Sequence, residues 1–262
     1  MIDYLFDLPL LITGPAIVLS LCLYSLLGLK LVRRFILPRL QLQDSDSDFN
    51  GAMLQAVMVF YGLAVALIAV SVWETYGDVS KTVSQEATAI AALYRDVSSY
   101  PDAIRPELQE DLRVYVDYVI NEAWPLQRRG QIPGHGVQLL DRFQNSLTHF
   151  EPATEGQKLL HAEALRAYNI MIQARRLRID TVETQLPGVL WFIIIAGALI
   201  SLCSSFFFRI HEVRLHAIQV VLLATFIGLV IFMIFALDRP YRGDLGIPAT
   251  SYELIRSQLM KP

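Results

Sequence analysis

The chain has 262 residues, 54% of them hydrophobic and 18% charged, with a formal net charge of −3. A soluble domain of this length is less apolar and does not gather its apolar residues into four blocks, so the composition predicts an integral membrane protein. The slight acidic excess argues against nucleic acid as a partner, because a nucleic-acid-binding surface is basic. Both cysteines lie in apolar runs, the histidines are scattered, and no nucleotide-binding or metal-binding motif occurs, so we expect no cofactor and no metal site.

The first apolar run extends from Leu8 to Leu29 and is long enough for a helix that crosses the bilayer. A signal peptide is the competing interpretation. The preceding segment, Met1 to Asp7, carries two aspartates and no lysine or arginine, and no small-residue cleavage site follows the run, so we favour a membrane span. A polar connection comes next, and Asn50-Gly51 at its end predicts a turn.

The second apolar run, Ala52 to Trp73, continues without any proline into apolar residues at alternating spacings of three and four. This pattern predicts one continuous helix that leaves the membrane and becomes the first helix of a bundle. Trp73 and Tyr76 lie at the expected membrane boundary, where aromatic side chains are favoured. The apolar stripe beyond the span consists of Tyr76, Val79, Val83, Ile90, Leu93 and Val97.

The charged segment 74–185 predicts a helical bundle outside the membrane. We expect a helix from about Ala103 to Arg129 and a shorter one from about Val137 to His149. A long returning helix follows an N-capping Thr154 and leads into the third span. The first of these helices carries Leu108, Leu112, Tyr115, Val119 and Trp124 on one face, and the returning helix carries Leu165, Tyr168, Ile172, Ile179, Val182 and Leu186.

Two charged residues interrupt the apolar stripes of the outgoing and returning helices. Glu86 falls on the first stripe and Arg175 on the second, and both lie roughly 15–20 Å beyond the membrane at about 1.5 Å per helical residue. We therefore predict that they pair inside the bundle. One interpretation is a buried ion pair that fixes the register of the helices. The other is a charged ring or ion site that faces an axis, which we favour less because structural pairs are commoner than sites.

The third and fourth spans are predicted at Pro187–Phe208 and Leu215–Leu237, and the fourth ends sharply at Asp238-Arg239-Pro240. Charged groups at this depth are either functional or serve as a stop with interfacial anchoring, and both interpretations stay open. A short tail with one amphipathic helix, Ser251–Met260, follows. The predicted divisions are 1–73 and 186–238 for the spans, 74–185 for the bundle and 239–262 for the tail.

The basic residues that flank the spans predict the orientation. They concentrate in the first connection and the last hairpin, which places both in the cytoplasm and the bundle on the extracytoplasmic side of a cell inner membrane, in a multi-pass protein. Arginines beside the third span and after the fourth argue for the opposite orientation. The connection residues are Lys30, Arg33, Arg34, Arg39, Arg209 and Arg214. No acidic or basic residue lies deep in any span, which argues against a proton-coupled transporter and permits an apolar pore gate.

Four short motifs carry a resemblance to a known family. They are Glu86-Ala87, Leu93-Tyr94-Arg95, Glu122-Ala123-Trp124-Pro125 and Leu237-Asp238-Arg239-Pro240-Tyr241-Arg242-Gly243. With these residues the chain resembles, over most of its length, the bestrophin-like family of uncharacterised bacterial membrane proteins. The last motif is the most specific, with Asp238, Arg239, Pro240 and Gly243 as its signature.

The resemblance implies a distant likeness to bestrophins, which are pentameric anion channels with a pore lined by the second span. By that likeness the pore-lining positions here are Phe60, Tyr61, Gly62 and Val65. Two features depart from bestrophins, which keep their helical domain in the cytoplasm and bind calcium through an acidic cluster that is not evident in this sequence.

The sequence therefore predicts an all-α integral membrane protein with four transmembrane helices and a helical bundle inserted between spans two and three. We expect a homo-oligomer in the lipid bilayer, a pentamer by the resemblance. No catalytic constellation is visible, so we do not expect an enzyme. The leading hypothesis is an anion channel lined by the second span, and the alternative is a non-conducting sensor or scaffold whose bundle binds a protein partner.

Overall fold

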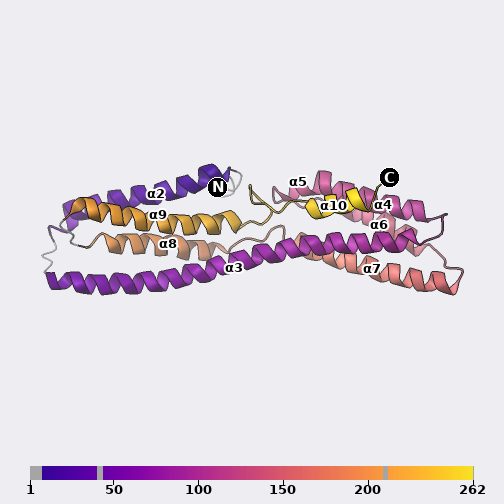
Figure 1. The fold of residues 1–262 in the computed structure, drawn as a ribbon, viewed down its shortest axis with the longest axis horizontal. Coiled ribbons are helices and arrows are strands. Elements are labelled where there is room, and N and C mark those ends of the chain that lie inside the picture. Colours follow the sequence, from indigo (N-terminus) through magenta and orange to yellow (C-terminus); the bar gives the residue numbers. More distant parts are fainter. Residues whose placement is uncertain (1–7, 40–43, 209–211, 262) are drawn as a thin grey trace. The chain divides into compact units, whose positions relative to one another are not determined.

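The structure is a computed structural model that describes residues 8–39, 44–208 and 212–261, with side chains omitted for 44–50. Every regular element in these ranges is a helix, so the all-α prediction is confirmed (Figure 1). The chain forms two compact units, one from 1–75 and 185–238 and the other from 76–184 and 239–262. Arg209, one of the residues used to predict orientation, lies outside the described residues, as does the segment Met1–Asp7.

The first unit contains four helices that are long and apolar enough to cross a membrane, as predicted, and we call it the span unit. The helices are α2 (Leu10–Leu31), which continues into a π-helical turn at Val32–Ile36, the first part of α3 (Asp44–Ser98), α8 (Gly188–Ser205) and α9 (Val213–Leu237). Helices α2 and α9 lie side by side (Figure 1). Gly228 makes this close approach possible, because a Cβ atom there would lie 3.1 Å from the Cα of Val18.

Helix α3 has 55 residues and passes from the span unit into the second unit without a break. It begins at Asp44, so the predicted polar connection and turn at Asn50-Gly51 are wrong: both residues are helical. The physical reason is compositional. The segment 44–48 is rich in aspartate, a residue type favoured in the first turn of a helix by the positive end of the helix dipole, and this preference outweighs the turn propensity of Asn-Gly.

The second unit is the predicted helical bundle, and we call it the bundle unit. Besides the second part of α3, it contains α4 (Arg105–Tyr118), a π-helical turn at Val119–Ala123, α5 (Trp124–Gln127), α6 (His135–Thr148), α7 (Glu155–Asp180) and α10 (Thr250–Gln258). The predicted apolar face of the α4 region is buried at all five positions. The π-helical turn explains the five-residue step from Val119 to Trp124, since one extra residue per turn returns Trp124 to the same face.

The returning helix α7 starts as predicted but presents a different face to the core. The Thr154 hydroxyl accepts a hydrogen bond from the Gln157 backbone N–H at 3.2 Å, which confirms the N-cap. The buried stripe is shifted by about one residue from the predicted one, because small side chains face the core and larger aliphatic ones lie at its margin. Its members are Ala164, Ala167, Tyr168, Met171, Ala174 and Arg178.

The C-terminal residues predicted as a separate tail belong to the bundle core. Tyr241, Ile247, Tyr252 and Met260 are buried there together with side chains from α3, α4 and α7. Because each of them removes a large apolar surface from water, the segment after α9 is an integral part of the bundle. This packing forms the site described next.

Candidate functional site

A buried ion pair lies at the centre of the bundle unit. Glu86 on α3 is 0% exposed and Arg178 on α7 is 1% exposed, and the Nε of Arg178 donates a hydrogen bond to Oε2 of Glu86. The other carboxylate oxygen, Oε1, accepts a hydrogen bond from the Tyr115 hydroxyl at 2.7 Å. Arg178 also donates from Nη1 to the side-chain oxygen of Gln127 at 2.6 Å. The pair thus joins α3, α4, α5 and α7, with several of its polar atoms satisfied inside the core.

Aromatic rings enclose the Arg178 guanidinium. Its central carbon lies 5.6 Å from the centre of the Trp124 ring and 5.9 Å from that of Tyr252, distances at which a cation is attracted to an aromatic face. The Trp124 ring packs in turn against Tyr241 at 5.6 Å and Tyr252 at 5.5 Å. The Arg178 guanidinium is therefore enclosed by residues from both chain segments of the bundle unit, 76–184 and 239–262.

The environment of the pair keeps the arginine charged and the tyrosines neutral. Burial, and after it the charge of Glu86, raises the pKa of Tyr115 and of Tyr252 well above the usual value for a phenol. Burial by itself lowers the pKa of Arg178, but the attraction of Glu86 outweighs this effect and the pKa is raised. The negative charge of the Glu86 carboxylate contributes to the raised pKa of Tyr252. The Tyr252 hydroxyl makes no hydrogen bond of ordinary geometry within the described residues. The arrangement suits a permanent electrostatic link between helices rather than a proton relay.

The prediction that Glu86 pairs with Arg175 is wrong in its second partner. Glu86 lies on the buried stripe of α3 as expected, but its partner is Arg178. The reason is the rotation of α7: alanines at its core face shift the buried stripe by about one residue, or roughly 100° around the helix. Arg175 is half-buried beside this centre, where its charge slightly opposes the rise in the pKa of Tyr115.

The signature after the last span begins with a carboxylate that holds the start of α8. Asp238 is buried in the span unit, and its Oδ1 accepts the backbone N–H of Leu186 at 2.6 Å. Its Oδ2 accepts the indole N–H of Trp191 at 3.2 Å. Leu186 precedes the N-cap Pro187 and Trp191 lies early in α8, so this carboxylate ties the segment before α8 to the helix and lies near its positive end.

The rest of the signature folds onto the bundle. Pro240 contributes its carbonyl to the backbone N–H of Ile247 at 2.8 Å, which closes a loop after Arg239. Gly243 has a φ of +70°, a conformation that favours glycine, and its carbonyl accepts a hydrogen bond from Arg128 at 2.8 Å. The Trp124 indole N–H donates to the Ile247 carbonyl at 3.1 Å. The motif around Trp124 and the signature, more than a hundred residues apart in sequence, are thus in direct contact.

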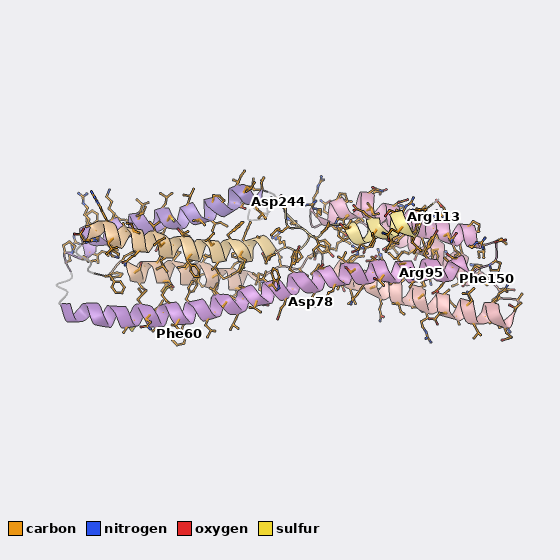
Figure 2. All side chains as sticks on the ribbon, viewed as in Figure 1. Phe60, Asp78, Arg95, Arg113, Phe150 and Asp244 are labelled. Atoms are coloured by element: carbon orange, nitrogen blue, oxygen red, sulfur yellow. The ribbon has the colours of Figure 1, made fainter. Side chains whose placement is uncertain are left out.

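The four residues predicted to line a pore lie on different faces of α3. Phe60 is 74% exposed and points away from the other helices (Figure 2), and Gly62 is also exposed. The Tyr61 hydroxyl donates to the Ile194 carbonyl at 3.1 Å, and its ring lies against Gly197 of α8. Val65 is only 4% exposed. The prediction is therefore wrong for Val65, which packs inside the unit, and Tyr61 directs its hydroxyl to α8 instead of a free face.

Comparison with models of known protein families identifies the family of this chain. The model of the bestrophin-like domain matches residues 20–252, which includes part of the first span, the other three spans and most of the bundle. The chain belongs to the bestrophin-like family. No curated protein and no solved structure matches it. Among the residues that the structure describes, no group of three or more His, Cys, Asp or Glu side chains is placed to hold a metal ion.

Proposed function

We propose that this bestrophin-like protein forms a homo-oligomer in the cell inner membrane and conducts anions along a path lined by α3. The observation that carries the proposal is the exposed face of α3 in the span unit. Exposed apolar side chains recur there, from Phe60 onward at spacings of three and four, and have no partner helix within the described part of the unit. They are Met53, Val59, Phe60, Leu63, Leu67 and Val70.

The chemistry of this face suits an apolar gate. The span part of α3, from Ala52 to Trp73, contains no acidic or basic residue. A constriction made of such side chains controls conduction by losing or gaining water, and does not require a titrating group. Phe60 is the largest of these six side chains, so we assign it the narrowest point. Anion selectivity rests on the likeness to bestrophins, as does a pentameric assembly.

The proposed orientation places the bundle unit outside the cytoplasm, because the first connection carries a cluster of basic residues. An added cysteine at Ser146, which lies on α6 in the bundle unit, tests this placement. We expect it to react in intact cells with a maleimide that does not cross membranes. Protection in intact cells, followed by reaction after lysis, would instead place the bundle in the cytoplasm.

The test of conduction starts with the mass of the full chain in detergent and a projection image of the particle. We expect a ring with an axial opening and an anion flux in proteoliposomes that increases when Phe60→Ala widens the constriction. Phe226→Ala is the matched control, because Phe226 on α9 is a similarly exposed aromatic residue within a span. An equal effect of both substitutions, or a monomeric particle, would contradict the proposed path.

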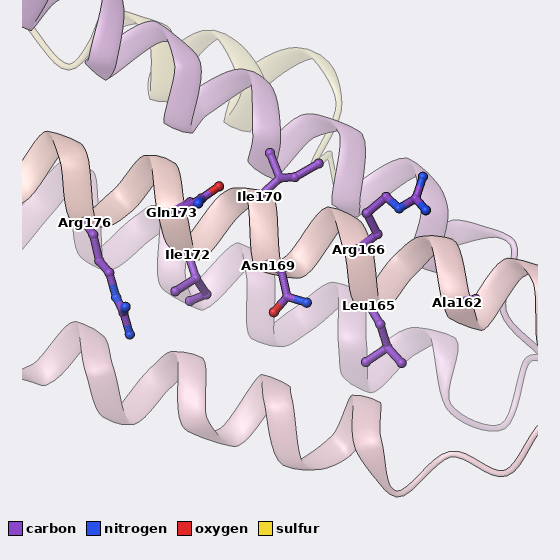
Figure 3. A pocket seen from close by; sticks show the side chains of 8 residues that line it. All are labelled: Ala162, Leu165, Arg166, Asn169, Ile170, Ile172, Gln173 and Arg176. Carbon is purple, nitrogen blue, oxygen red and sulfur yellow. The ribbon is translucent and has the colours of Figure 1, made fainter.

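Open grooves on the bundle unit favour the second hypothesis, a non-conducting sensor or scaffold. One groove of about 590 Å³ runs along α7 and is lined by Leu165, Arg166, Asn169 and Arg176 among others (Figure 3). Another of about 710 Å³ lies between α3 and α7. A monomer in detergent without ion flux, together with binding of a protein partner that Asn169→Arg abolishes, would support this hypothesis over the channel.

A further inference from the structure

Three arginines gather where the loop after α9 meets the end of α5, and we call Arg128, Arg129 and Arg242 the arginine cluster. Arg242 donates from Nη2 to the Arg129 carbonyl at 2.8 Å, and Arg128 donates from Nη2 to the Gly243 carbonyl at 2.8 Å. The two loops are therefore tied together by reciprocal guanidinium–carbonyl hydrogen bonds. Arg128 and Arg129 are exposed and Arg242 is half-exposed.

A glycine leaves the space that one of these guanidinium groups occupies. Gly130 has a φ of +73°, and a Cβ atom at this position would lie 2.4 Å from Nη2 of Arg242. Any larger residue would both strain the backbone and displace the guanidinium. The guanidinium groups of Arg128 and Arg242 are thus held in place by the two loops, and a pre-positioned cationic group loses little conformational freedom when it binds an anion.

Chain connectivity keeps the cluster close to the lipid headgroups. The apolar helix α9 ends at Leu237, and Arg242 follows five positions later. A hydrogen bond from the backbone N–H of Arg242 to the carbonyl of Arg239, at 3.0 Å, folds the intervening residues into a turn. Since such a turn spans less than about 7 Å and the two residues before it add at most about 7 Å, Arg242 lies within about 14 Å of the end of the span. The headgroup layer extends roughly 5–8 Å beyond the hydrocarbon core, and the long side chain of an arginine can reach back toward it.

A second connection supports the same depth. The Tyr76 hydroxyl donates to the Leu245 carbonyl at 2.9 Å, and Tyr76 is the first residue of the bundle unit after the span part of α3. Leu245 is 46% exposed and Ile132, two residues beyond Gly130, is 45% exposed. The arginines are therefore accompanied by exposed apolar side chains, a combination typical of surfaces that lie in the membrane interface.

We propose that the arginine cluster binds the phosphate headgroup of an anionic phospholipid. Guanidinium groups match phosphate oxygens with paired N–H donors, and a basic surface beside the membrane is attracted to anionic lipids. Asp244 is the acidic neighbour in the same loop, whereas Asp238 is buried in the span unit and accepts hydrogen bonds from Leu186 and Trp191. The three arginines of the cluster outnumber the carboxylate of Asp244, so their summed formal charge is positive. The site is independent of whether α3 conducts ions.

Binding of a fluorescent phosphatidylglycerol to the full chain in a neutral detergent tests the proposal. We expect saturable binding that weakens about fivefold in Arg129→Gln and about 25-fold in Arg128→Gln/Arg129→Gln, because each basic residue contributes similarly near an anionic headgroup. Arg166→Gln is the matched control, since Arg166 is an exposed arginine on α7 and belongs to neither loop of the cluster. Labelled phosphatidylcholine should bind all variants equally.

Arg129→Gln decides the outcome by itself if the double variant is less stable, because its side chain is exposed and the hydrogen bond to Arg242 uses its backbone carbonyl. Unchanged phosphatidylglycerol affinity in Arg129→Gln, or an equal loss in Arg166→Gln, would overturn the proposal. So would competition by inorganic phosphate at concentrations similar to the lipid, which would identify a soluble anion as the ligand.

Discussion

Replacing Glu86 with leucine tests the buried ion pair most directly. The substitution leaves the Arg178 charge buried without its carboxylate, which costs about 3–5 kcal/mol in comparable sites. It also removes the acceptor of the buried Tyr115 hydroxyl, which costs about 1–3 kcal/mol. Both losses come from removing the same carboxylate and therefore do not add fully, so we expect the free energy of unfolding to fall by about 4–6 kcal/mol.

Thermal unfolding of the full chain in detergent, followed by tryptophan fluorescence, measures this effect. At about 2–4 °C per kcal/mol for a chain of this size, the melting temperature should fall by roughly 10–20 °C. The melting temperature of the conservative variant Glu86→Gln should fall less, because its amide oxygen still accepts a hydrogen bond. Glu163→Gln on α7 is the control, since this glutamate is exposed and its ion pair with Arg166 is long, at 3.9 Å.

The double variant Glu86→Leu/Arg178→Met tests whether Glu86 and Arg178 stabilise the protein as an interacting pair or as two independent charges. With both charges removed and apolar volume retained, it should be more stable than either single variant. A melting temperature of Glu86→Leu equal to that of Glu163→Gln would refute the reasoning. A double variant as unstable as the sum of both single variants would refute the pairing with Arg178.

Two further predictions concern the signature and the tyrosines. Asp238→Ala leaves the Leu186 backbone N–H and the Trp191 indole N–H without their acceptor, so the free energy of unfolding should fall by about 2–3 kcal/mol. Asp238→Asn keeps an acceptor oxygen and should be destabilised less. Equal melting temperatures of the wild type and Asp238→Ala would contradict this prediction. Burial raises the pKa of Tyr100 to about 12, helped by the charge of Asp96, and burial likewise raises the pKa of Tyr168 to about 12. A raised pKa means that the folded state holds its protons more tightly than the unfolded state, whose tyrosines titrate near 10, so this contribution to stability is complete below pH 10 and is lost between about pH 10 and 12. Melting temperatures across this range should fall more steeply in the wild type than in Tyr100→Phe, and equal slopes would count against the assignment.

Periodicity in the sequence predicted most of the helices, because a helix that buries one face repeats its apolar residues every three to four positions. The stripe on α3 and the face of α4 were both correct, and the five-residue step from Val119 to Trp124 matches a π-helical turn. Glu86 was found for the same reason: a charged residue in an apolar stripe is conspicuous. The partner on α7 was missed because the alanines at its core face contribute little to a hydropathy pattern, although they permit close helix packing.

The sequence by itself therefore determined the four spans, the uninterrupted helix α3, the helical bundle and the presence of a buried carboxylate, since each depends on local composition and spacing. Only the tertiary structure decided that Arg178 completes the ion pair, that Tyr61 and Val65 pack inward, and that the residues after α9 join the bundle core through Tyr241 and Tyr252. These features depend on the rotation of one helix against another and on contacts between segments that are far apart in the sequence. Such contacts leave no periodic signal along the chain, because they are selected by the volume and hydrogen bonds of the assembled core.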